Sequence, residues 1–145
     1  MRKIAVALMF LFSSFPASAA EQPDEVEEMG QLAGVIYACG AHKPLYQFEE
    51  ILSRYISNTS ATEDIEKERL RLYAQAKMST FSVYRQRKDE CPSTVNDFLK
   101  MPIFKSELYS DGTVRLPDGK TLYPRGQKKM AAGAKKIYPA KKGKK

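Results

Sequence analysis

The sequence of 145 residues contains no tryptophan, one histidine and two cysteines. A serine–histidine–aspartate site would have to use His42 as its base, and no G-x-S-x-G motif is present beside it. The stretch "CGAH" at residues 39–42 matches neither the C-x-x-C motif of thiol oxidoreductases nor the C-x-x-C-H motif of haem attachment. Nothing resembles a base-reading motif for nucleic acid. The sequence therefore contains no motif that identifies an activity, and it implies no cofactor.

Long hydrophobic runs are also lacking. Residues 4–12 form an apolar run of nine, far short of the ~20 residues that span a bilayer. The run follows a positive start, "MRK", and precedes the small-residue stretch "SSFPASAA", which is the layout of a secretory signal peptide. We expect cleavage after Ala19 or Ala20, with no lipid anchor because no cysteine lies at this exit. The mature protein of about 125 residues is then expected in the periplasm or outside the cell, with no transmembrane span.

Charge is divided unevenly along the chain. Residues 21–109 carry 11 basic and 15 acidic residues, a net charge of −4, whereas residues 110–145 carry 11 basic and two acidic residues, a net charge of +9. A mildly acidic body is therefore followed by a strongly basic end.

The apolar residues recur with helical spacing over most of the body, which predicts a mainly α fold. Four helices are expected, at about residues 24–40, 44–56, 62–90 and 93–101. Gly40 is a natural stop for the first helix, and Pro44 suits the first turn of the second. Ser60 or Thr62 would cap the third. Two Asp-Gly pairs around "TVRL" and "KTLY" then predict a β-hairpin.

The expected architecture is a small three- to four-helix bundle tied by one disulfide, with a short C-terminal β-hairpin and a disordered basic tail. In chain order, we expect a signal peptide over residues 1–20, a helical domain over 21–109, a β-hairpin over 110–125 and a disordered Lys-rich tail over 126–145.

Cys39 and Cys91 are expected to form a structural disulfide, because two cysteines in an exported chain most simply pair with each other. The alternative is a metal site made of Cys39, His42 and Cys91. A structural zinc site needs a fourth ligand, and no carboxylate or methionine is distinguished by its spacing. We therefore expect no metal, and we interpret His42 as an exposed turn residue.

The paired carboxylates offer a second alternative, a glycosidase-like pair of acids. The pairs are Glu49 with Glu50, Glu63 with Asp64, and Glu66 with Glu68. They alternate with polar and basic neighbours, which is typical of a solvated helix face. The aromatic residues could line a ligand pocket, but at helical spacing we interpret them as core.

The Lys-rich tail is the clearest functional signal in the sequence, because clustered cations attract polyanions. Outside the inner membrane these would be anionic envelope polymers or lipid head groups rather than nucleic acid. The candidate polyanion-binding residues are Lys128, Lys129, Lys135, Lys136, Lys141, Lys142, Lys144 and Lys145.

The stretch from Gly30 to Leu99 resembles a family of small uncharacterised exported helical proteins of alphaproteobacteria. The residues that match its pattern are Leu32, Tyr37, Cys39, Gly40, Phe81, Tyr84 and Cys91. The resemblance covers about half of the mature chain. It implies an exported location and a disulfide, and it implies no activity.

These observations favour a non-enzymatic accessory protein of the periplasm or cell envelope. Its helical body would bind a protein partner, and its tail would bind anionic polymers or lipids. The alternatives are a cell-wall hydrolase that uses paired carboxylates, and an exported chaperone or secretion accessory protein.

Overall fold

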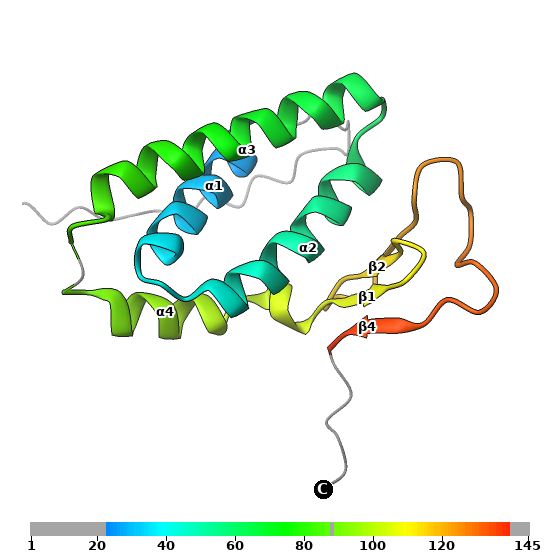
Figure 1. Ribbon diagram of the computed structural model, residues 1–145. Helices are drawn as coiled ribbons and strands as arrows, with labels where there is room; N and C mark the ends of the chain where they lie inside the picture. The colour runs from blue at the N-terminus through cyan, green and yellow to red at the C-terminus, as the bar shows by residue number, and fades with distance from the viewer. Residues whose placement is uncertain (1–22, 88, 140–145) are drawn as a thin grey trace, which may run out of the picture.

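The computed structural model describes residues 23–87 and 89–139 (Figure 1). The predicted signal peptide lies outside the described residues, as do Lys141, Lys142, Lys144 and Lys145. Within them the protein is mainly helical, with a small antiparallel sheet towards the C-terminus. The predicted fold class is therefore confirmed. No helix in the described ranges is both long and apolar enough to cross a bilayer.

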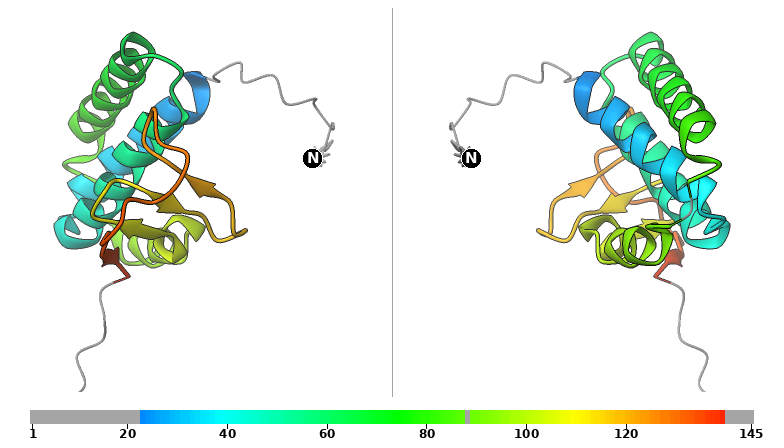
Figure 2. Two further views of the ribbon diagram at one scale, coloured as in Figure 1. Left: turned by 90° about the vertical axis from the view of Figure 1, so that its right-hand side faces the viewer. Right: turned by 90° about the vertical axis from the view of Figure 1, so that its left-hand side faces the viewer.

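Four α-helices and one short 3₁₀-helix come first along the chain. They are α1 (Pro23–Ala38), α2 (His42–Thr59), α3 (Glu63–Tyr84), α4 (Cys91–Leu99) and η1 (Pro102–Lys105). The strands are β1 (Glu107–Tyr109), β2 (Val114–Arg115), β3 (Thr121–Leu122) and β4 (Lys136–Tyr138). They form one antiparallel sheet in the order β3-β2-β1-β4. The sheet lies beside α2, and α3 lies on the other side of the helical body (Figures 1 and 2).

The end of α1 and the start of α2 agree with the prediction from the sequence. Gly40 has a φ of 77°, the left-handed conformation that suits a glycine just after a helix. The second helix begins at His42, two residues before Pro44, so this proline lies in its first turn.

The third helix decides between two predicted caps and corrects one expected boundary. Its N-cap is Thr62, whose hydroxyl accepts a hydrogen bond from the Ile65 N–H at 3.3 Å. Ser60 is instead buried at the end of α2 and donates to the carbonyl of Ile56 at 2.6 Å. The helix also ends at Tyr84 rather than near residue 90. All described residues from 85 to 90 are exposed, so no buried apolar face supports a further helical turn there.

Two glycines let α1 approach α3 very closely. A Cβ atom on Gly30 would lie 2.5 Å from the carbonyl oxygen of Tyr73, and one on Gly34 would overlap the carbonyl oxygen of Lys77. Both glycines are buried and face the backbone of α3. Side chains larger than hydrogen would therefore push the two helices apart. This contact was not predicted from the sequence.

Two groups of buried residues form the core. The helical cluster consists of Val26, Ala33, Ile36, Leu45, Phe48, Leu52, Ile56, Tyr73 and Phe98. The sheet cluster consists of Ile51, Leu108, Val114 and Leu122. Helix α2 contributes to both clusters, because Ile51 lies in the sheet cluster and its neighbour Leu52 in the helical cluster.

The predicted hairpin is confirmed as β2 and β3, and it is part of a larger sheet. Asn58 on α2 donates from its amide nitrogen to the carbonyls of Gly112 and Leu122, at 2.9 and 3.1 Å. Arg125 donates to the carboxylate of Glu66 on α3 at 2.7 Å. These contacts hold the hairpin against the helices, which a lone hairpin in water would need.

The predicted boundary of the tail at residue 126 is corrected. Lys136–Tyr138 form strand β4 beside β1, although they lie in a segment that we expected to be disordered. Asp111 accepts a hydrogen bond from the Ala131 N–H at 2.8 Å, and Ser110 accepts one from the Lys135 N–H at 2.9 Å. Long-range pairing of this kind orders a segment whose composition alone predicts disorder. We call residues 126–139 the basic segment.

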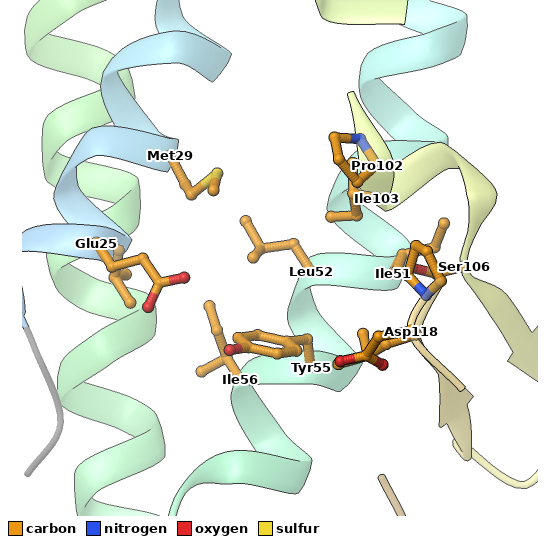
Figure 3. A pocket seen from close by; sticks show the side chains of 13 residues that line it. Glu25, Met29, Ile51, Leu52, Tyr55, Ile56, Pro102, Ile103, Ser106 and Asp118 are labelled. Carbon is orange, nitrogen blue, oxygen red and sulfur yellow. The ribbon is translucent and has the colours of Figure 1, made fainter. Parts of the chain in front are cut away.

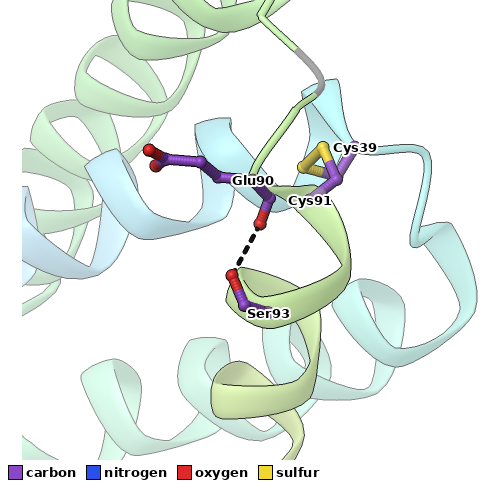
Figure 4. Close-up of a disulfide and its surroundings, with 4 residues drawn as sticks. All are labelled: Cys39, Glu90, Cys91 and Ser93. Carbon is purple, nitrogen blue, oxygen red and sulfur yellow. Dashed lines mark hydrogen bonds between the residues drawn. A yellow bond between two sulfur atoms is a disulfide. The ribbon is translucent and has the colours of Figure 1, made fainter.

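The Cys39–Cys91 disulfide is confirmed, with a Cα–Cα distance of 5.5 Å (Figure 4). Cys39 follows α1 directly, and Cys91 is the first residue of α4 rather than the last of the long helix. The hydroxyl of Ser93 donates to the carbonyl of Glu90 at the start of α4. The disulfide therefore joins the end of α1 to the start of α4.

We predict that Gly34→Ala destabilises the protein by about 1–3 kcal/mol, because the added methyl group collides with the backbone of α3. In a solvated helix the same change would stabilise by about 1 kcal/mol. Urea unfolding followed by circular dichroism measures the difference. Gln31→Ala, at an exposed position of the same helix, is the control. A variant as stable as the parent would show that α1 and α3 can separate without cost.

Candidate binding site

A cavity of about 350 Å³ lies between α1, α2, η1 and the turn that joins β2 to β3 (Figure 3). Its apolar lining residues are Val26, Met29, Ile51, Leu52, Tyr55, Ile56, Pro102, Ile103, Leu116 and Pro117. Its polar lining residues are Glu25, Ser106 and Asp118. A small, mostly apolar cavity with a few polar groups is the usual form of a ligand site.

The cavity lies where the two hydrophobic clusters meet. Met29 packs against the helical cluster and Leu116 against the sheet cluster. Tyr55 and Ile103 pack against both. Leu52 lies between Met29 on one side and Ile103 on the other (Figure 3). The cavity is left open because α1 and the β2–β3 turn both lie next to α2 but on opposite sides of the cavity, so they do not contact each other across it.

The edge of the cavity is acidic. Glu25 and Asp118 lie on opposite sides of it, with the ring of Tyr55 between them (Figure 3). Both carboxylates belong to exposed residues, and no lysine or arginine is among the lining residues. Burial raises the pKa of the Tyr55 phenol, and the negative charge of Glu25 raises it further. The phenol therefore stays neutral at physiological pH and can donate or accept a hydrogen bond.

Ser106 is a buried polar residue in the wall of the cavity. The residue is fully buried, and its hydroxyl has no hydrogen-bond partner among the described residues. Only its backbone is satisfied locally, since its N–H donates to the Ile103 carbonyl at 3.0 Å. An unpaired buried hydroxyl costs about 1–3 kcal/mol.

The predicted polyanion-binding lysines do not line the cavity. Within the basic segment, Lys128, Lys129, Lys135 and Lys136 are exposed. Lys136 pairs with Glu107 on β1, and this hydrogen bond raises the pKa of the lysine and lowers that of the carboxyl. The structure therefore separates one lysine that ties β4 to β1 from three whose side chains have no ion pair among the described residues.

Each carboxylate pair considered in the sequence includes a side chain that forms an ion pair or a hydrogen bond within the fold. Glu49 accepts hydrogen bonds from the hydroxyl of Tyr73, at 2.8 Å, and from Lys77. Three other carboxylates of these pairs form ion pairs, Glu63 with Lys67, Glu68 with Arg71, and Glu66 with Arg125. None of these carboxylates lines the cavity.

The three-residue spacing of Cys39 and His42 does not make a ligand pair in this structure. The disulfide uses both thiols, and His42 is the exposed first residue of α2. Its ring packs edge-on against Tyr37, with the centroids 5.1 Å apart. Residues 23–87 and 89–139 contain no group of three metal-ligating side chains.

Arg69 is a buried residue that the sequence analysis missed. Its Nη1 donates to the carbonyl of Ile56 at 3.2 Å and to the hydroxyls of Thr59 and Ser60, both at 2.9 Å. A cation at this position satisfies the C-terminal end of α2 and complements its dipole. It thereby fixes Ile56, which lines the cavity. Arg69 precedes the buried Tyr73 by one helical turn, and this position on the apolar face of α3 is the signal in the sequence that it is buried.

Comparisons of the chain with protein-family models, curated proteins and solved structures find no match. The resemblance to small exported helical proteins therefore stays a prediction. A functional proposal for this protein must rest on the chemistry of its own residues.

We predict that Ser106→Ala leaves the free energy of unfolding unchanged or raises it, because it removes a buried hydroxyl that has no partner. Ser60→Ala is the matched control. Its buried hydroxyl has two partners, and we expect a loss of about 1–3 kcal/mol. Urea unfolding measures both. A loss for Ser106→Ala equal to that of Ser60→Ala would mean that the Ser106 hydroxyl is satisfied, for example by ordered water.

Proposed function

We propose that this protein is a non-enzymatic accessory protein of the cell envelope that binds a protein partner. The observation that supports this most directly is the apolar cavity, in which an apolar group of the partner would be buried. The cavity is already formed between α1, α2 and the hairpin, and it is lined by ten apolar residues. Burying apolar area from a partner in such a site is favourable at roughly 25 cal/mol per Å².

The proposed location outside the inner membrane has two supports. The first twenty residues have the layout of a signal peptide. The Cys39–Cys91 disulfide is typical of proteins in oxidising compartments. We therefore place the mature protein in the periplasm, or outside the cell after secretion.

The basic segment would supply a second contact, to anionic envelope polymers or lipid head groups. Hydrogen bonds to Asp111 and Ser110 hold this segment against the sheet, with Lys128, Lys129 and Lys135 exposed. Binding would weaken as salt rises, because exposed charges are screened. Lys141, Lys142, Lys144 and Lys145 would extend the same surface in our proposal.

An exported chaperone would use the same cavity, and it would differ by accepting many clients instead of one. The described contacts give no comparable support to a hydrolase. The paired carboxylates considered for that role take part in ion pairs and hydrogen bonds along the helices, and none reaches the cavity.

The cavity can be tested in the intact envelope with a photo-crosslinking amino acid in place of Leu116. We expect one discrete, protease-sensitive adduct, which Met29→Trp abolishes because the larger side chain fills the cavity. Val83→Trp, at a position 58% exposed on α3, is the control and should leave the adduct unchanged. Mass spectrometry identifies the captured chain. An adduct that survives Met29→Trp contradicts binding in the cavity, and a broad ladder of adducts favours the chaperone.

The basic segment needs a test that preserves β4, which deletion of the segment would remove. We predict that replacing Lys128, Lys129 and Lys135 together by glutamine lowers the affinity for anionic vesicles or purified lipopolysaccharide several-fold at low salt. Replacing Lys67, Lys100 and Lys105, which lie on the helical body, is the matched control. Sedimentation binding assays measure the affinity. Equal affinities for both triple variants would show that net charge alone, rather than this segment, attracts the polyanion.

A further inference from the structure

The cavity has a charge pattern that restricts its occupant. Among the described residues that line it, the only carboxylate, lysine, arginine or histidine side chains are the carboxylates of Glu25 and Asp118. They lie on opposite sides of an apolar interior (Figure 3). A negatively charged ligand, such as a fatty acid or a phosphate ester, would meet like charge at both sides. A ligand with an apolar centre and positive charge on both flanks would meet opposite charge at both.

The size of the cavity restricts the occupant further. About 350 Å³ is near the lower end of ligand cavities, so it accommodates a single large side chain better than a long lipid chain. One polar group among the apolar ones is accessible. The neutral phenol of Tyr55 can form a hydrogen bond with a polar tip, whereas the hydroxyl of Ser106 has almost no accessible surface. An apolar body with one hydroxyl at its end is the chemistry of a tyrosine side chain.

We infer that the cavity binds a positively charged stretch of the partner protein. This stretch has a tyrosine, whose side chain enters the cavity, and lysine or arginine residues on both sides of that tyrosine. This inference rests on the proposed function and names the chemistry of the partner. The ring would pack between Met29, Leu52 and Ile103. The flanking cations would lie near Glu25 and Asp118, and the phenol of the inserted tyrosine would hydrogen-bond to the phenol of Tyr55.

The charged edge and the apolar interior of the cavity would contribute differently to the affinity. The carboxylates are exposed, so each ion pair strengthens binding by roughly 1.4- to 5-fold and depends on salt. The ring is buried on binding, and its contribution does not depend on salt. Charge therefore selects the partner and accelerates association, while the apolar contact supplies most of the affinity.

The inference is tested by calorimetry with the full mature protein and three short peptides. The first has one tyrosine between two lysine pairs, the second has glutamines in place of the lysines, and the third has glutamates. We expect the lysine peptide to bind about tenfold more tightly than the glutamine peptide at low salt, and the glutamate peptide not to bind. A phenylalanine version of the first peptide should lose affinity in the parent and not in Tyr55→Phe.

Charge variants of the protein provide the second arm. Glu25→Gln combined with Asp118→Asn should reduce the affinity for the lysine peptide to that for the glutamine peptide, without changing the latter. Glu90→Gln with Asp97→Asn neutralises two exposed carboxylates that do not line the cavity, and it should have no effect. Equal affinities for the lysine and glutamine peptides, or no binding of the lysine peptide, would overturn the inference.

Blocking the cavity with Met29→Trp distinguishes a failure of this inference from a failure of the proposed function. If Met29→Trp abolishes binding of both the lysine and glutamine peptides, the cavity is a binding site whatever the role of charge. If both still bind, the cavity itself is not the site, and the proposed function fails with the inference. Self-association that Met29→Trp abolishes, measured by sedimentation, would assign the cavity to a second copy of this chain and would also overturn the inference.

Discussion

Helix α2 packs against helices through one side and against the sheet through another, and the rest of the structure is arranged around this shared contact. Phe48 and Leu52 belong to the helical cluster, and Ile51 belongs to the sheet cluster. Arg69 and Asn58 hold the C-terminal half of α2 by hydrogen bonds, the first to the helix end and the second to the hairpin. The cavity is the gap left between the two clusters on this helix.

The uneven charge of the sequence is partly balanced in the fold. Arg125 and Lys136 come from the basic end of the chain, and they pair with Glu66 and Glu107 of the acidic body. These pairs fasten the sheet to the helices and β4 to β1. The remaining charges define two surfaces of opposite sign, the carboxylates at the edge of the cavity and the exposed lysines of the basic segment. A partner and an anionic polymer could therefore be bound without competing for the same residues.

The sequence predicted the elements whose signals are local. Helical spacing placed α1 and α2 correctly, Gly40 marked the end of α1, and the Asp-Gly pairs marked the hairpin. The disulfide followed from the number of cysteines and the predicted signal peptide. The predicted end of α3 was wrong because it was set by Cys91 and the helix-breaking Pro92, whereas residues 85–90 include no apolar side chain that could pack against the core.

Strands β1 and β4 were missed because they pair across a long separation in sequence, and three-residue strands have almost no periodic signal of their own. The candidate site was missed for a related reason. Glu25, Ser106 and Asp118 come from three distant parts of the chain, and each looks ordinary in its own segment. Likewise, Gly30 and Gly34 are unremarkable in sequence until α3 lies against them.

The sequence by itself determined which faces of each segment are apolar, where turns occur, which cysteines pair and how charge is divided. Each of these follows from the chemistry of neighbouring residues. Only the tertiary structure decided which apolar faces meet, which lysine is paired, and where a gap remains between the two clusters. Packing joins residues that are far apart along the chain, and a cavity is the space that such packing leaves unfilled.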